Sequence, residues 1–144
     1  MARTPARVVL DTNILVSAIV FGGKPRQILL SILENEIQAV TSNTLLAELI
    51  ETLSKKFKLS LTGLRLVEKQ IRQNFKFIQP VTTISFLKDD PDNRVLEAAS
   101  ESNCHYIITG DKELLALASF KHIKIVTAGE FLKRIWKFPN PIVD

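Results

Sequence analysis

Short runs of apolar residues recur along the chain, and between them apolar and polar positions alternate with the spacing of helices. A short apolar run bounded by polar or turn residues is typical of a strand that is buried on both faces. Such runs predict five strands, at residues 8–10, 37–40, 81–86, 106–109 and 123–126, the third of them either straight or kinked.

The intervening stretches predict helices, because leucine and isoleucine recur there with helical spacing, most clearly between residues 43 and 57. The predicted helices span residues 12–20, 25–35, 43–57, 61–77, 91–102, 112–118 and 128–136. Pro25 suits the first turn of its helix, where the missing N–H has no partner to lose. Asp90 is expected to cap the helix that begins at Pro91.

Strands that alternate with helices indicate a parallel sheet with helices on both faces. We therefore expect an α/β fold, a three-layer α/β/α sandwich around a central, mostly parallel five-stranded sheet. A chain of 144 residues with 46% hydrophobic residues suits one core, so residues 1–144 are expected to form a single domain. In such sheets the ligand crevice lies outside the carboxyl ends of the strands.

Composition narrows the classes of protein. A single cysteine, Cys104, excludes an internal disulfide and a cysteine-rich zinc site, and it suits the reducing cytoplasm in which we expect the protein. We expect no membrane span, because Asp11 and Asn13 interrupt the first apolar run and no stretch reaches roughly 18 apolar residues. With 19 Lys and Arg against 15 Asp and Glu, the net charge is +4, which mildly favours a polyanionic partner.

Acidic residues follow the predicted strands. Asp11 ends the first strand, Asp111 follows the fourth, Asp92 belongs to the acidic segment 89–92 at a helix start, and Glu48 lies in the first turns of another helix. Any one of them has an ordinary explanation as a helix cap or as a partner of the helix dipole. Because the carboxyl ends of parallel strands share one edge of a sheet, we expect these four acids to converge there.

Carboxylates that converge repel one another, by about 3 kcal/mol for a pair at about 5 Å and an effective dielectric near 20. A hard divalent cation resolves this conflict, since Mg²⁺ and Mn²⁺ take carboxylate and water oxygens. Zinc is disfavoured, because Cys104 and two separated histidines do not make a nitrogen and sulfur shell. Helical angles favour Glu48 over Glu51 as the acid that faces the site.

Three polar residues near these acids have two interpretations each. Asn13 either fixes a turn or orients Asp11. Thr109 is either a β-branched strand residue or a hydroxyl that contacts a ligand carboxylate. Asn93 either completes a first helical turn or replaces an acid near the metal.

The strings VVLDTNILVSA, TLLAELIE, DDPDNRVLEAA and YIITGDKELLAL, in this order, resemble the PIN-domain family. They are most similar to its branch of toxin components of toxin–antitoxin modules, related to VapC-type ribonucleases, and the resemblance covers about residues 7–133. It implies metal-holding acids at Asp11, Glu48, Asp92 and Asp111, with Asn13 and Thr109 in support. Family members often carry an acid where this chain has Asn93, so the third ligand is divided between Asp92 and Asn93.

The resemblance implies an endoribonuclease that uses Mg²⁺ or Mn²⁺ to hydrolyse single-stranded RNA, acting as the toxin of a pair. We expect RNA as substrate, a cognate antitoxin as protein partner, and a homodimer. One alternative is a catalytically inactive PIN-type module that binds nucleic acid or protein. Another, disfavoured because Asn13 stands where a second acid is usual, is a phosphatase with Asp11 as nucleophile.

Basic and aromatic side chains offer contacts for RNA. Each is weighed against an ordinary role on a solvated helix face or in packing. The basic candidates are Lys24, Arg26, Lys55, Lys56, Lys58, Arg65, Lys69 and Arg72, and the aromatic ones are Trp136 and Phe138.

Overall fold

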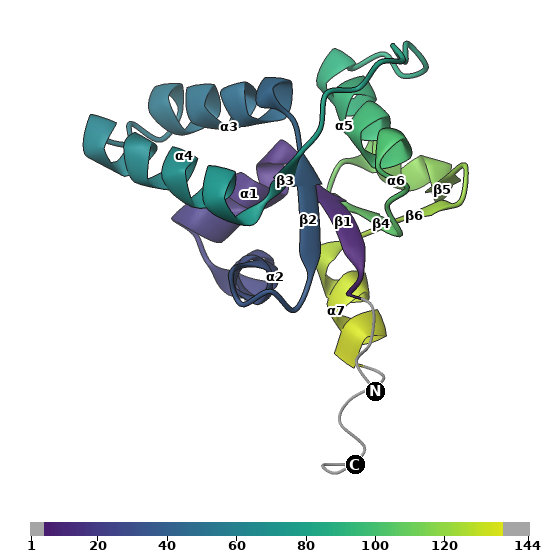
Figure 1. The fold of residues 1–144 in the computed structure, drawn as a ribbon, viewed down its shortest axis with the longest axis horizontal. Helices are drawn as coiled ribbons and strands as arrows, with labels where there is room; N and C mark the ends of the chain where they lie inside the picture. The colour runs from purple at the N-terminus through teal and green to yellow at the C-terminus, as the bar shows by residue number, and fades with distance from the viewer. Residues whose placement is uncertain (1–4, 137–144) are drawn as a thin grey trace.

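The computed structural model describes residues 5–136 (Figure 1). In chain order its elements are β1 (Arg7–Leu10), α1 (Thr12–Val20), α2 (Gly23–Leu33), β2 (Gln38–Thr41), α3 (Asn43–Lys55), α4 (Leu61–Asn74), β3 (Lys76–Phe77), α5 (Asp90–Glu101), β4 (Tyr106–Ile108), α6 (Lys112–Leu117), β5 (Ser119–Phe120), β6 (Ile123–Val126) and α7 (Ala128–Trp136). The helices expected at residues 12–20 and 128–136 are confirmed with those bounds. The side chain of Trp136 and all of Phe138 lie outside the described residues, so their stacking on bases stays a prediction.

The strands form one six-stranded sheet in the order β3-β2-β1-β4-β6-β5. Neighbouring strands are parallel except for β5, which runs antiparallel to β6. The mostly parallel sheet is confirmed, but the expected number of five strands is wrong. The apolar pattern misses β3 and β5 because two-residue strands are too short to show a period.

The strand expected at residues 81–86 is wrong. Val81 is 84% exposed and Phe86 is 64% exposed, so neither side chain belongs to a core. The backbone N–H of Ile84 donates to Glu97 Oε2 at 2.7 Å, a side-chain acceptor, instead of joining a ladder. The third strand is β3, which pairs with β2 and takes residues that the helical pattern had assigned to the end of α4.

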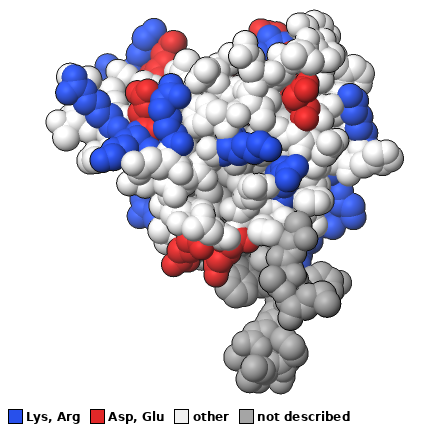
Figure 2. All heavy atoms as spheres, viewed as in Figure 1, with Lys and Arg blue, Asp and Glu red and all other residues white. Residues whose placement is uncertain are grey.

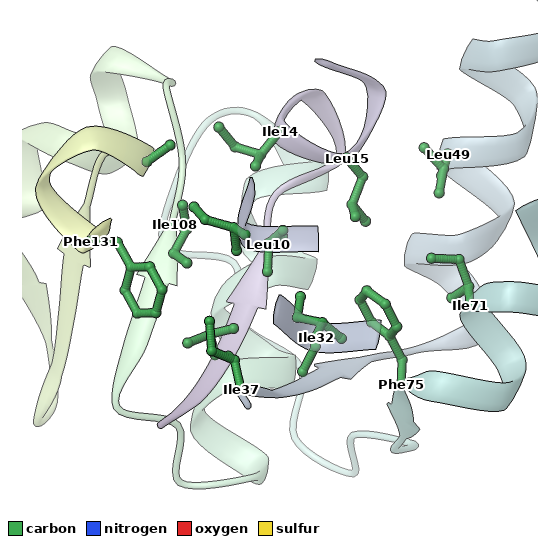
Figure 3. Packing of buried hydrophobic residues seen from close by; sticks show 14 of the residues in the cluster. Leu10, Ile14, Leu15, Ile32, Ile37, Leu49, Ile71, Phe75, Ile108 and Phe131 are labelled. Carbon is green, nitrogen blue, oxygen red and sulfur yellow. The ribbon is translucent and has the colours of Figure 1, made fainter. Parts of the chain in front are cut away.

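Side chains alternate across the sheet and build two cores. Val8 and Leu10 face a core that is covered by α1, α2, α3, α4 and α7. Val9 faces the opposite core, which is covered mainly by α5 and α6. Figure 3 shows the first core, where Leu10 of β1 lies beside Ile108 of β4 and near Phe131 of α7. The α/β/α layers are therefore those expected.

The chain turns sharply between α1 and α2. Gly22 has a φ of +97°, a backbone conformation that residues other than glycine rarely adopt. Arg26, one of the predicted RNA contacts, donates to the carbonyl oxygens of Ala18 at 2.8 Å and Ile19 at 3.0 Å, so it satisfies the end of α1. Within residues 5–136 no single helix is long and apolar enough to cross a membrane, and α1 with α2 reach that length and composition only across a 96° bend.

Candidate metal centre

Two acids leave the carboxyl ends of neighbouring parallel strands and begin helices. Asp11 follows β1 and caps α1, its Oδ1 accepting the N–H of Asn13 at 2.8 Å. Asp111 caps α6, and its Oδ1 accepts the N–H groups of Glu113 at 2.9 Å and Leu114 at 3.0 Å. Capping explains one oxygen of each carboxylate and leaves the second oxygen of each to be explained.

Thr109 links these two acids. Its fully buried hydroxyl donates to Asp11 Oδ2 at 2.5 Å and accepts the backbone N–H of Asp111 at 2.9 Å. The interpretation of Thr109 as a hydroxyl that contacts a carboxylate therefore agrees with the structure. One side chain at the end of β4 fixes both the Asp11 carboxylate and the entry into α6.

Thr109→Val should destabilise the protein by about 1–3 kcal/mol, because it removes a buried donor and a buried acceptor while keeping the shape of the side chain. Urea unfolding at pH 8 measures this difference. Thr109→Ser keeps the hydroxyl and loses only a methyl group, so it should be the milder variant. A Thr109→Val variant as stable as the wild type, beside a destabilised Thr109→Ser, would assign the role of Thr109 to packing of its methyl group, which valine keeps.

Three carboxylates form the tightest acidic group in the described part of the chain. Asp89, Asp92 and Asp111 each place an oxygen within 4.8 Å of the others. The sequence pattern places Asp89 in the acidic segment 89–92 and predicts no role for it. Its spacing of three residues from Asp92, which places both on one side of a first helical turn, was the signal that could have identified it.

Asp92 has a buried carboxylate oxygen without a hydrogen-bond partner in the described part of the chain. The residue is 6% exposed, and the oxygen is Oδ2. Burial, then the nearby charges of Asp111 and Asp89, raise the pKa of Asp92 to about 7. Burial also raises the pKa of Asp11, an effect that the hydrogen bond from Thr109 opposes. An unpaired buried carboxylate is costly, and a cation at this point would remove the cost.

Asp90 does not cap α5, contrary to expectation. The cap residue is Asp89, and Asp90 is the first residue of the helix. The Asp90 side chain is 75% exposed and pairs with Arg94 at 3.2 Å. Helix α5 therefore begins one residue before Pro91, the expected first residue, because proline is accepted within the first turn of a helix.

The sequence leaves Asp92 and Asn93 as alternatives for the third ligand, and the hydrogen bonds of Asn93 favour Asp92. The Asn93 residue is 2% exposed, and its amide makes two hydrogen bonds of 2.8 Å with the backbone of Leu87. Both ends of that amide are thus engaged away from the carboxylates. Asn93 attaches the preceding loop to α5.

Glu48 and Asn13 are less firmly tied to the group. Glu48 lies half-buried on α3 and is not among the three residues whose oxygens lie within 4.8 Å of one another. Asn13 supplies the N–H that Asp11 accepts, while its exposed side chain lines an open hollow of about 570 Å³ together with Asp111 and Glu113. This hollow is a place where a ligand can approach Asp111.

No nitrogen or sulfur ligand accompanies the carboxylates in this group. His105 and His122 line a different hollow, beside the beginnings of β4 and β6 and thus at the opposite edge of the sheet. Arg94 directs its guanidinium to Glu97 at 2.7 Å and to Asp90. An oxygen-only donor set fits Mg²⁺ or Mn²⁺ and does not fit zinc.

Four of the basic residues predicted to contact RNA lie among acids on α3 and α4: Lys55, Arg65, Lys69 and Arg72. Lys55 pairs with Glu51 at 3.4 Å, and Arg72 pairs with Glu68 at 3.0 Å. Figure 2 shows blue and red atoms side by side on the end of the molecule that these two helices form. Two of the predicted contacts on this surface are therefore paired with acids, and RNA binding by these basic residues stays a prediction.

Comparison with known proteins gives consistent matches over most of the chain. A family model described as "PIN domain" matches residues 7–113. An uncharacterized protein of Methanocaldococcus jannaschii, MJ1680, is 32% identical over 151 residues that cover 96% of this chain and 97% of that protein. The crystal structure of PAE2754 from Pyrobaculum aerophilum is similar with a TM-score of 0.58 and 16% identity, and the match covers 92% of this chain and 90% of that one. At that identity the structural match speaks for the fold alone.

Proposed function

Because the chain belongs to the PIN-domain family, whose members are generally nucleases, we propose that it is a Mg²⁺- or Mn²⁺-dependent endoribonuclease acting on single-stranded RNA. The observation that carries the proposal is the buried Asp92 Oδ2, which has no hydrogen-bond partner among residues 5–136. Asp92 also belongs to the three-acid group with Asp89 and Asp111. Acidic residues at helix starts are common, but a buried carboxylate is normally paired. A cation supplies the missing partner.

In the proposed site Asp11, Asp92 and Asp111 would hold the metal, and Asp89 joins them because one of its oxygens lies within 4.8 Å of oxygens of Asp92 and Asp111. Asp11 and Asp111 each use Oδ1 as a cap, which orients the carboxylate before any ion arrives. Glu48 is kept as a further proposed ligand, because α3 packs against both α1 and α5. When bound, the ion would lower the pKa of a coordinated water and neutralise charge on the leaving oxygen of a phosphodiester.

Chelation should abolish cleavage. Purified protein incubated with a pool of single-stranded RNA should produce fragments with Mn²⁺ or Mg²⁺ and none with excess EDTA, because no histidine pair is available near the carboxylates to act without metal. Gel analysis of the fragments, with Mn²⁺ added back after EDTA, measures the dependence. Cleavage that survives complete chelation would reject the metal mechanism.

We extend the proposal to a toxin that acts in the cytoplasm as a homodimer and is neutralised by an antitoxin. The support is the resemblance of the four motifs to the toxin branch of the family. Expression of the wild type in a bacterial host should arrest growth, and the Asp92→Asn variant should not. Light scattering on the purified chain tests the dimer.

A further inference from the structure

The segment between β3 and α5, residues 78–89, contains no helix or strand, and side chains of α5 hold its backbone. Glu97 accepts the N–H of Ile84 at 2.7 Å, and Glu101 accepts the N–H of Val81 at 3.4 Å. A backbone without a ladder is free to adopt many conformations, and fixing each residue costs about 1–2 kcal/mol. Side-chain attachments of this kind therefore help to place the segment, together with the packing of Ile84 and Leu87 against the second core.

The attachments nearest the acidic group come immediately before Asp89. The Asn93 amide accepts the N–H of Leu87 and donates to the Leu87 carbonyl, both at 2.8 Å. Glu113, at the start of α6, accepts the N–H of Lys88 at 3.2 Å. The two residues before Asp89 are thus held by side chains of two different helices, α5 and α6.

We propose that Asn93 and Glu113 are positioning residues that hold Asp89 at the metal centre. The proposal rests on the proposed function and adds that some residues of this region bind the metal while others position the ligands. Asp89 is the most exposed member of the three-acid group. Its carbonyl oxygen accepts the N–H of Asp92 at 3.1 Å, but its side chain makes no cap hydrogen bond, so the direction of the carboxylate depends on the backbone that leads into Asp89. Asn93 and Glu113 order the backbone before an ion binds, which preserves affinity for the ion.

Two glutamate variants provide a matched test on the full-length chain. Glu113→Ala releases the segment at Lys88, next to Asp89, whereas Glu101→Ala releases it at Val81, far along the same segment. Mn²⁺ titration followed by electron paramagnetic resonance of the free ion measures affinity without any RNA. Glu113→Ala should bind Mn²⁺ about tenfold more weakly, as loss of a partner of a ligand typically does, and Glu101→Ala should bind like the wild type.

Glu113→Gln separates the hydrogen bond from the charge. Its amide oxygen can still accept the N–H of Lys88, so it should restore most of the affinity that Glu113→Ala loses. Asn93→Ala should weaken Mn²⁺ binding at least as much as Glu113→Ala, and thermal melts of each variant verify that it is folded. Glu113 is exposed, so its variants keep the test available even if Asn93→Ala does not fold.

Equal Mn²⁺ affinity of Glu113→Ala and Glu101→Ala would overturn the positioning role. Glu113→Gln as weak as Glu113→Ala would also overturn it, because the effect would then come from charge. If the wild type itself binds no Mn²⁺, the proposed function fails and the positioning role fails with it. Binding that is equal in the wild type and all variants removes only the positioning role.

Discussion

Asp92→Asn is expected to lower Mn²⁺-dependent RNA cleavage by more than about a hundredfold, since partners of metal ligands alone typically account for about 10- to 100-fold. The variant keeps the size of the side chain but replaces the carboxylate with a neutral amide. One oxygen of that carboxylate is buried without a hydrogen-bond partner among the described residues. Folding should survive, because the amide can donate to the carboxylates of Asp89 or Asp111, whose oxygens lie within 4.8 Å. Initial rates on one RNA substrate across a Mn²⁺ titration measure the effect.

Asp90→Asn is the matched control, with the same change of charge in the same turn of α5. The Asp90 side chain is 75% exposed and pairs only with Arg94, so its loss should cost about 0.2–1 kcal/mol of stability and leave cleavage near the wild-type rate. An inactive Asp90→Asn variant beside an active Asp92→Asn variant would mean that the site is assigned to the wrong residue.

Without metal, the wild-type protein should lose stability as the pH rises from about 4 to about 7. The pKa of Asp92 is raised from 3.8 to about 7 in the folded chain, so over this range the folded state binds more protons than the unfolded state. The raised pKa of Asp11 acts in the same direction. A shift of this size corresponds to on the order of 4 kcal/mol, at about 1.4 kcal/mol per pKa unit. Urea unfolding in EDTA at a series of pH values measures it.

Asp92→Asn removes the titrating group, so its stability should change much less between pH 4 and pH 7. At pH 7.5 Mn²⁺ should then stabilise the wild type by about 2.7 kcal/mol at 100 times its Kd, or about 5–10 °C in Tm. The variant should gain much less. A metal-free stability difference between the wild type and Asp92→Asn that stays the same from pH 4 to pH 7 would show that Asp92 is paired or solvated in solution. Equal Mn²⁺ gains would show that it is not a ligand.

Asp92 is a better residue for this test than Asp11. Both oxygens of Asp11 accept hydrogen bonds, one from the Asn13 N–H and one from the Thr109 hydroxyl. An amide at position 11 keeps the first bond but presents a donor to the Thr109 hydroxyl, which already accepts the N–H of Asp111. Asp11→Asn therefore combines the loss of a charge with the loss of a buried hydrogen bond.

Helices and strands with a clear hydrophobic period were predictable from the sequence, because the interactions that form them are local. The α1 helix and strand β6 were predicted with their observed bounds, since hydrophobic period and capping act within a turn or a few strand residues. The position of Asp11 at the end of β1 follows in the same way, from an apolar run that stops at an acid. Even the role of Asp111 as a helix cap is a property of its own turn.

Residues 81–86 show where local reasoning ends. Their composition suits a strand, but the N–H of Ile84 bonds to Glu97 and that of Leu87 to Asn93, side chains that lie on another element. A strand is defined by its partner as much as by its residues, and here α5 provides the acceptors instead of a neighbouring strand. No pattern within the segment contains that information.

The sequence by itself determined that the acids lie at the carboxyl edge of a parallel sheet, because strand ends and helix starts are local features that the topology collects at one edge. Only the tertiary structure decided which acids form one group. Asp89 and Asp92 share a turn, but Asp111 joins them because α6 begins beside α5, with Glu113 bonded to the loop that leads into α5. Likewise, only the packing around α5 left Asp92 Oδ2 buried without a described partner, since burial depends on every neighbouring element at once.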